Sequence, residues 1–273
     1  MAKERLDNLL VKRNLIESRE KAKRMIMAGL VFSKLERLDK PGMKVDENIP
    51  LSVKGTLKYV SRGGYKLEKA LTKFNTSVQN KVIVDIGSST GGFTDCALQN
   101  GAKLIYAIDV GYNQLDWKLR NDSRVIVNEK TNFRYVTKDL FTEGLPNFST
   151  IDVSFISLRL ILLVLKTILK ENSEVITLIK PQFEAKREQV GKKGVIKDKQ
   201  IHKSVLKQII DFAENEGFPL LNVTYSPITG TIGNIEFLAH FGYKLNKNDE
   251  RLLTQNDLHI ENVIAEAHDQ LHR

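Results

Sequence analysis

The sequence predicts an α/β fold with a doubly wound sheet, preceded by a small basic module. Residues 81–84 form a short β-branched run, a glycine-rich turn follows, and residues 94–100 are compatible with a helix. A second apolar run, 104–108, ends in an acidic residue about 20 positions beyond the turn. Further apolar runs alternate with helix-compatible segments as far as residue 241, as in a Rossmann-like sheet.

The glycine-rich turn predicts a nucleotide-type ligand. Gly87, Gly91 and Gly92 do not fit the G-x-G-x-x-G dinucleotide fingerprint. An acidic residue on the strand, then a glycine and a glycine pair, is typical of S-adenosylmethionine (SAM) methyltransferases, and Asp109 is placed to bind a ribose diol. A tight turn without a ligand is the alternative. The expected cofactor-binding residues are Asp85, Gly87, Ser88, Gly91, Gly92, Phe93, Asp109, Val110 and Asp152.

Hydrophobic periodicity places the remaining elements of this domain. We expect seven strands, at 81–84, 104–108, 124–128, 150–154, 174–179, 220–225 and 235–241. We expect helices at 61–74, 94–100, 157–170 and 201–217, and a mobile polar loop at 184–199.

Composition excludes several classes of protein. The 273 residues, 41% of them hydrophobic, suffice for one sizeable α/β domain and a small one. No apolar run approaches the ~18 residues of a membrane-spanning helix, and nothing at the start of the chain predicts a signal peptide. The single cysteine, Cys96, rules out an internal disulfide. We therefore expect a cytoplasmic protein.

Positive charge is concentrated near the N-terminus. The chain has a net charge of +9, and residues 1–60 hold 14 Lys and Arg against 8 Asp and Glu. A basic module on a nearly neutral body predicts a polyanionic partner, with ordinary surface lysine as the alternative.

The basic module resembles the S-four-type RNA-binding domain, an α-L fold. Helices are expected at 5–13 and 19–28, with Ser18 as an N-cap and Gly29 as a stop. The matching residues are 5–7, Leu15, 18–19, Ala22, 29–31 and 41–42. The expected RNA-binding residues are Arg5, Arg19, Lys23, Arg24 and Arg62. The expected domains are 1–56 for this module, 57–60 for a linker, 61–245 for a methyltransferase domain and 246–273 for a tail helix.

Two charged residues fall at predicted strand ends. Asp152 and Lys180 occupy the carboxyl ends of the fourth and fifth strands, where open α/β sheets bind ligands. A lysine in that position is costly unless it is paired or used. Over nearly its whole length the sequence resembles the TlyA family, the so-called haemolysin A proteins, with a catalytic domain of the FtsJ type. The matching segments are 61–67, 85–94, 109–112, 152–157, 180–184 and 233–236.

This resemblance implies a catalytic set and a substrate. The family's Lys-Asp-Lys-Glu set falls on Lys66, Asp152, Lys180 and Glu236, and the family acts on the ribose 2′-hydroxyl of cytidine in ribosomal RNA, free or in ribosomal subunits. The expected cofactor is SAM, with no metal, because the methyl group is already activated. We expect Lys180 to be the base, with the two lysines depressing each other's pKa. A non-catalytic RNA-binding protein and a membrane-active haemolysin are the alternatives.

Overall fold

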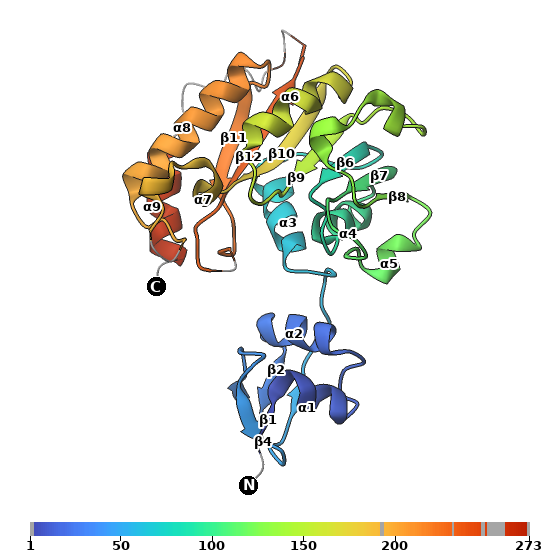
Figure 1. The fold of residues 1–273 in the computed structure, drawn as a ribbon, viewed down its shortest axis with the longest axis vertical. Helices are drawn as coiled ribbons and strands as arrows, with labels where there is room; N and C mark the ends of the chain where they lie inside the picture. Colours follow the sequence, from blue (N-terminus) through green and yellow to red (C-terminus); the bar gives the residue numbers. More distant parts are fainter. Residues whose placement is uncertain (1–2, 192–193, 231, 247–248, 250–259, 272–273) are drawn as a thin grey trace. The chain divides into compact units, whose positions relative to one another are not determined.

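The computed structural model describes residues 3–191, 194–230, 232–246, 249 and 260–271. The chain divides into two compact units, Met1–Arg62 and Gly63–Arg273 (Figure 1). Each unit has its own hydrophobic core, as expected for two domains.

The first unit packs two helices against short strand pairs. Its elements are β1 (Lys3–Arg5), α1 (Leu6–Lys12), α2 (Arg19–Met27), β2 (Val31–Ser33), β3 (Glu36–Arg37), β4 (Lys44–Asp46) and β5 (Ser52–Val53). β1 pairs with β4, and β2 lies between β3 and β5, all antiparallel. Ser18 caps α2 by accepting a hydrogen bond from the Lys21 amide, as predicted. Strands β1, β3 and β4 were not expected, because two or three largely polar residues show no period.

Within the described residues, the second unit is built on a seven-stranded sheet, which confirms the predicted fold class. Its strands are β6 (Val82–Ile86), β7 (Leu104–Ile108), β8 (Val125–Asn128), β9 (Phe148–Ile151), β10 (Ser173–Ile179), β11 (Leu220–Tyr225) and β12 (Phe237–Tyr243). The order is β11-β12-β10-β9-β6-β7-β8, and β12 runs in the opposite direction to the other six strands. The chain leaves β6 toward β7 and returns to β9 on the other side. This reversal opens a crevice at the carboxyl ends of β6 and β9.

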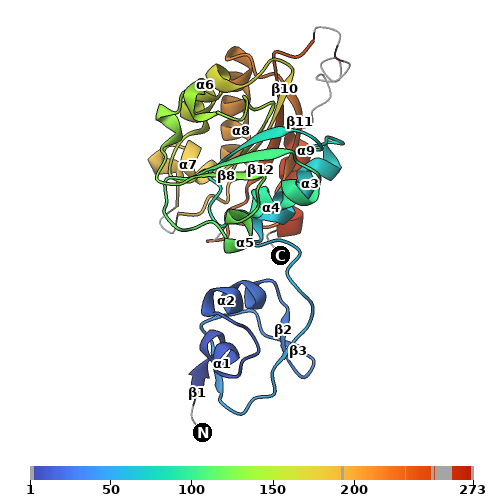
Figure 2. The same ribbon diagram turned by 90° about the vertical axis from the view of Figure 1, so that its right-hand side faces the viewer.

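Helices cover both faces of the sheet (Figures 1 and 2). They are α3 (Gly63–Lys73), α4 (Gly92–Gln99), α5 (Trp117–Arg120), α6 (Leu158–Ile168), α7 (Pro181–Glu184), α8 (Lys199–Asn215) and α9 (Ile260–Leu271), with 3₁₀ turns η1 (Phe133–Tyr135), η2 (Lys138–Leu140) and η3 (Arg187–Gln189). α3 packs on α4, and α6 packs on α8 over the main core. Of the helices in the described part of the chain, none has the length and apolarity to cross a membrane.

Two strands differ in position from the prediction. The fourth, expected at 150–154, is β9 at Phe148–Ile151, and the seventh, expected at 235–241, is β12 at Phe237–Tyr243. All four residues of β9 are buried, but two of them, Ser149 and Thr150, are polar, so hydrophobicity does not reveal where the strand begins. Consequently Asp152 and Glu236 lie just outside the strands rather than within them. Of the predicted tail helix, α9 is described, while residues 247–248, 250–259 and 272–273 lie outside the described part.

Candidate active site

Four charged side chains from distant parts of the chain meet at one edge of the sheet. Lys66 Nζ lies 2.8 Å from Glu236 Oε2 and 3.5 Å from Asp152 Oδ2. Lys180 Nζ lies 2.5 Å from Asp152 Oδ1 and donates a hydrogen bond of 3.1 Å to Ser154 Oγ. The four groups form a chain of alternating charge in the order Glu236, Lys66, Asp152, Lys180, which we call the charge chain.

Sheet topology explains this meeting. Asp152 and Lys180 directly follow the parallel strands β9 and β10, so both lie at the carboxyl edge. β12 runs antiparallel to β10, with Phe237 opposite Ile179, so Glu236 reaches the same edge from the start of its strand. α3 supplies Lys66 among its buried residues, next to Leu67 on the face that packs inward.

Electrostatics within the charge chain keeps Lys66 and Asp152 ionised. Burial lowers the pKa of Lys66, but Asp152 and Glu236 outweigh burial, and its pKa is raised. Burial likewise opposes ionisation of Asp152, but Lys66 and Lys180 hold the pKa of that carboxyl below its ordinary value. The expected mutual depression of the two lysines therefore fails for Lys66, because a carboxylate stands between them.

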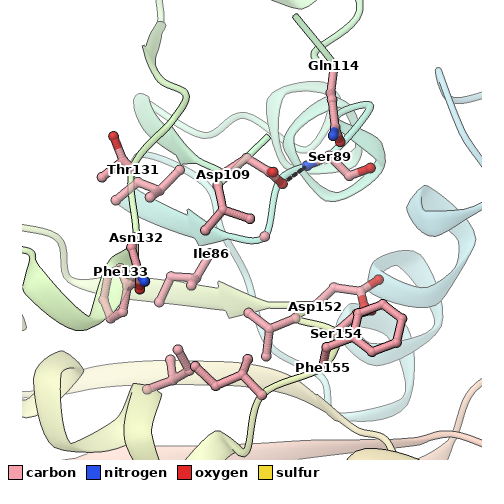
Figure 3. A pocket seen from close by; sticks show the side chains of 16 residues that line it. Ile86, Ser89, Asp109, Gln114, Thr131, Asn132, Phe133, Asp152, Ser154 and Phe155 are labelled. Atoms are coloured by element: carbon pink, nitrogen blue, oxygen red, sulfur yellow. Dashed lines mark hydrogen bonds between the residues drawn. The ribbon is translucent and has the colours of Figure 1, made fainter. Parts of the chain in front are cut away.

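A cavity of about 370 Å³ opens beside the charge chain (Figure 3). This volume lies within the range of small-molecule sites. Its floor comes from the ends of β6, β7 and β9 and from the loops that follow β7, β8 and β9. The Asp109 carboxylate is fixed at its upper rim by the Ser89 amide at 2.8 Å and the Gly111 amide at 2.7 Å. The lining residues are Ile86, Gly87, Ser89, Ile108, Asp109, Val110, Gln114, Thr131, Asn132, Phe133, Asp152, Val153, Ser154, Phe155, Ile156 and Ile161.

The structure divides the expected cofactor residues into two groups. Those lining the cavity are Gly87, Asp109, Val110 and Asp152, whereas Asp85, Ser88, Gly91, Gly92 and Phe93 belong to β6, the turn and the start of α4 and are not among the lining residues. Asp85 is buried and accepts hydrogen bonds from the Thr94 and Thr150 hydroxyls at 2.6 and 2.8 Å. Burial raises the pKa of Asp85 to about 6, although both hydroxyls oppose the rise. Asp85 therefore holds β6, α4 and β9 together beneath the cavity.

Gly87 lies at the closest approach between the two strand ends. Its φ is +80°, and a Cβ built there would lie 2.6 Å from the carbonyl oxygen of Asp152. Only glycine combines this backbone conformation with that contact. The glycine thereby fixes how near Asp152 stands to the cavity.

One carboxylate organises the loops on the far side of the cavity. Glu129 accepts hydrogen bonds from the amides of Asn113, Gln114 and Leu115 at 2.9, 2.9 and 3.2 Å. Arg120 Nη2 lies 2.7 Å from the same carboxylate. Burial opposes its charge, yet the Arg120 hydrogen bond and the three amides lower the pKa of Glu129 to about 2. This carboxylate ties the loop after β7 to the end of β8.

Sequence reasoning did not select several residues of the site. Ser154, Gln114, Thr131 and Asn132 line the cavity, and Glu129 supports it. All of them lie at or beyond the carboxyl ends of predicted strands, which is the signal that could have found them. Their roles depend on side-chain orientation, which a strand pattern does not specify.

The expected RNA-binding residues all lie in the first unit, and four of them have defined partners. Arg5 and Arg19 both pair with buried Asp7, at 2.9 and 3.0 Å, and the hydrogen bond from Arg5 is the main cause of the lowered pKa of Asp7, about 2. Lys23 pairs with Glu20 at 2.7 Å, and Arg24 donates to the Val60 carbonyl at 2.6 Å. Arg62 is the last residue of that unit and is partly exposed. Arg5 and Arg19 remain roughly half exposed and can still face a ligand.

The sheet has one antiparallel strand next to its edge strand, and a glycine turn and a cavity lie where its strand order reverses. This combination is that of a Rossmann-type methyltransferase. The chain belongs to the FtsJ-like methyltransferase family, whose model matches residues 59–243, and an S4 domain matches residues 4–48.

Relatives share this organisation along most of their length. YqxC of Bacillus subtilis, described as a candidate rRNA methyltransferase, is 60% identical over 98% of this chain and 95% of its own. The 16S/23S rRNA (cytidine-2′-O)-methyltransferase TlyA of Mycobacterium tuberculosis is 38% identical over 85% of this chain and 87% of its own. The solved structure of a Streptococcus thermophilus protein, described as a candidate hemolysin, aligns with a TM-score of 0.76 at 53% identity, covering 99% of this chain and 97% of that one. The predicted family is thus confirmed.

Proposed function

We propose that the protein transfers a methyl group from SAM to the ribose 2′-hydroxyl of a cytidine in ribosomal RNA. The observation that carries this proposal is the charge chain at the edge of the cavity, where Asp152 belongs to both. The relatives' names supply the RNA class and the atom methylated. The S4 domain supplies a second surface for RNA.

The cavity fits SAM. Asp109, held by two backbone amides, would accept hydrogen bonds from the ribose hydroxyls, and Gly87 lines the cavity with backbone alone. The apolar Ile108, Val110 and Phe133 offer a surface for the adenine ring. The bound cofactor would supply an electrophilic methyl group on its sulfonium.

Within the charge chain, Lys180 is best placed to act on the ribose. Lys66 is enclosed by two carboxylates, whereas Lys180 has one carboxylate partner and one hydroxyl. An ammonium cannot accept a proton, so Lys180 would first give one proton to solvent. Its neutral Nζ would then accept a hydrogen bond from the 2′-hydroxyl and take that proton as the oxygen forms its bond to the methyl group and the bond from sulfur to methyl breaks. Asp152 orients Lys180, and Lys66 with Glu236 fixes Asp152. Exclusion of water and alignment of the hydroxyl supply the rest of the rate enhancement.

Replacing Lys180 tests this assignment. Lys180→Ala should lower methyl transfer to ribosomal RNA at least ~10²-fold, the usual contribution of a general base, while SAM binding measured by calorimetry stays within a few fold. Lys180→Arg should be nearly as inactive, because a guanidinium does not give up its proton in proteins. Lys207→Ala, at an exposed lysine on α8, is the matched control and should be fully active.

Asp109→Ala provides the contrasting case: unlike Lys180→Ala, it should weaken SAM binding. The product is identified by mapping 2′-O-methylation in ribosomal RNA from cells with and without the gene. An active Lys180→Arg enzyme would refute the assignment of Lys180 as the general base and show that only its positive charge is needed. A wild-type protein that binds RNA without methylating it would favour the non-catalytic alternative.

A further inference from the structure

Three large aromatic side chains are exposed on the segments that follow β7 and β8, beside the cofactor cavity. Tyr112, Trp117 and Tyr135 are 69%, 74% and 75% exposed. Tyr112 lies between two cavity-lining residues, Trp117 opens α5 three positions after Gln114, and Tyr135 follows Phe133 in η1. We call these three residues the aromatic rim. Rings left this open to water so close to a site indicate a binding surface.

Cations accompany the rim. Lys130 Nζ lies 4.2 Å from the centre of the Tyr112 ring, and the Arg134 guanidinium lies 5.4 Å from that of Tyr135. These distances are those of cation–π contacts, which hold each charge beside a ring face. Positive charge and aromatic surface are therefore presented together, rather than as separate patches.

The neighbouring carboxylates are already engaged. Glu129 is paired with Arg120, and Asp116 accepts from the Lys118 amide as the N-cap of α5. The Lys130 amide also donates to the Gly111 carbonyl at 2.8 Å, so the loops after β7 and β8 are joined by backbone as well as by Glu129. Hydrogen bonds therefore hold the loops of the rim to each other, and the positive charges beside the rings suit a negatively charged ligand.

We infer that the aromatic rim binds unpaired bases of the RNA substrate next to the nucleotide that is methylated. The inference rests on the proposed function and adds a surface to it. Stacking on an aromatic ring accepts any base, and cations beside the rings meet the phosphates between successive bases. Single-stranded RNA presents free base faces, whereas bases within a duplex are covered by their neighbours. A protein partner would also cover the rings, but the cations over them favour a polyanion.

The fluorescence of Trp117 reports binding to this surface directly, because it is the single tryptophan of the chain. Titrating the intact protein with a single-stranded oligoribonucleotide that spans the methylated position should quench its fluorescence saturably. A fully paired duplex of the same sequence should quench it far less. Tyr112→Ala and Tyr135→Ala should each weaken binding roughly 5- to 150-fold, the range for loss of one stacked base. Tyr112→Phe and Tyr135→Phe should bind like the wild type, because the ring remains.

Two controls separate this inference from the proposed function. Lys180→Ala should keep full quenching although it is inactive, and Leu160→Ala, at a half-exposed side chain on α6, should change neither binding nor activity. SAM affinity should be unchanged in both tyrosine variants, since neither ring lines the cavity.

The inference is overturned if single-stranded RNA leaves Trp117 fluorescence unchanged, or if the alanine variants bind naked RNA as tightly as the wild type. Variants that bind naked RNA normally but lose binding to a ribosomal subunit would assign the rim to a protein surface instead. If the wild type methylates RNA but the rim variants bind RNA normally, the proposed function stands and the inference about the rim fails. If RNA quenches Trp117 in a wild-type protein that has no methyltransferase activity, the inference stands and the proposed function fails.

Discussion

At the scale of single residues, burial determines what each charged group contributes. Burial opposes ionisation of both Asp152 and Asp85, but two lysines hold Asp152 ionised, whereas the hydrogen-bond donors to Asp85 are neutral. Their pKa values therefore move in opposite directions. Asp152 is therefore available to the site, whereas Asp85 supports the site by holding its elements together.

Asp85 should make stability depend on pH in an unusual direction. Its folded pKa of about 6 lies above the ordinary 3.8, so between about pH 4 and 6 the folded state binds the extra proton. In this window the contribution of Asp85 to stability falls as pH rises, by about 3 kcal/mol in total. The free energy of unfolding of the wild type, relative to Asp85→Asn, should accordingly rise as pH falls from about 6.5 to 4.

Denaturant unfolding of both proteins across this pH range measures the difference directly. Acid effects of other groups cancel in the comparison. A difference that is constant with pH would mean that Asp85 is ionised or neutral in both states alike. Thr94→Val, which removes a donor to the charged form, should raise the pKa of Asp85 further and extend the window upward.

At the scale of elements, the site depends on how loops are fastened at the ends of strands. Gly87 sets the separation between β6 and the residue after β9, and Glu129 fastens the loop after β7 to the end of β8. Neither residue needs to touch the reacting atoms. Each positions a residue that lines the cavity.

Glu129→Gln should weaken cofactor binding while leaving catalysis on bound substrate nearly intact. The amide loses the charge that pairs with Arg120 and offers one acceptor oxygen where the carboxylate offers two, so the loop carrying Val110 and Gln114 loosens. We expect a rise of roughly 5- to 30-fold in KM for SAM with kcat within about threefold, since an unmade bond of this kind costs ~1–2 kcal/mol.

Glu188→Gln, at an exposed glutamate in η3, is the matched control and should change neither constant. Steady-state kinetics with SAM varied gives the two constants. A fall in kcat with an unchanged KM would place Glu129 in the catalytic step and refute its role as a positioning residue.

At the scale of the whole molecule, charge is divided between two folded units. The S4 unit carries most of the net positive charge, and the methyltransferase unit carries the chemistry and the aromatic rim. In the S4 unit some cations also hold the fold, since Arg5 and Arg19 enclose Asp7. Binding and folding must therefore be measured separately there.

RNA affinity of the intact protein should fall steeply with salt, by a slope of about −0.7 to −0.9 in log K against log salt for each phosphate contact. Lys23→Ala should make the slope shallower by up to about one without changing the melting temperature, because its only partner shown is exposed Glu20. Arg19→Ala should make the slope shallower and lower the stability, since it removes one of the two arginines that pair with buried Asp7. Filter binding across a salt series and thermal unfolding give the two quantities.

Glu20→Gln is the matched control, because it frees Lys23 without removing it and should not make the slope shallower. A slope unchanged in Lys23→Ala and Arg19→Ala together would contradict RNA binding by this face of α2. In that case the methyltransferase unit would hold RNA by itself.

Local sequence patterns were sufficient for much of this structure. The glycine turn after β6, the acidic end of β7, the Ser18 cap and the strand at Leu220–Tyr225 follow from spacing within a few residues. Such features depend on hydrophobic periodicity and on the residues that a turn or cap requires, and both are determined by residues close together in the sequence. The fold class could therefore be predicted from these patterns, whereas the family was predicted from the resemblance of motifs along the chain.

Tertiary structure alone decided which charges pair. Lys66 and Glu236 are 170 positions apart, and Lys66 and Asp152 are 86 apart, so no local pattern relates them. Their meeting requires the antiparallel insertion of β12 beside β10 and the end of β9 at Ile151. The placement of Asp152 between two lysines then reversed the expected pKa of Lys66, because in a buried site the nearest opposite charge outweighs a more distant like one.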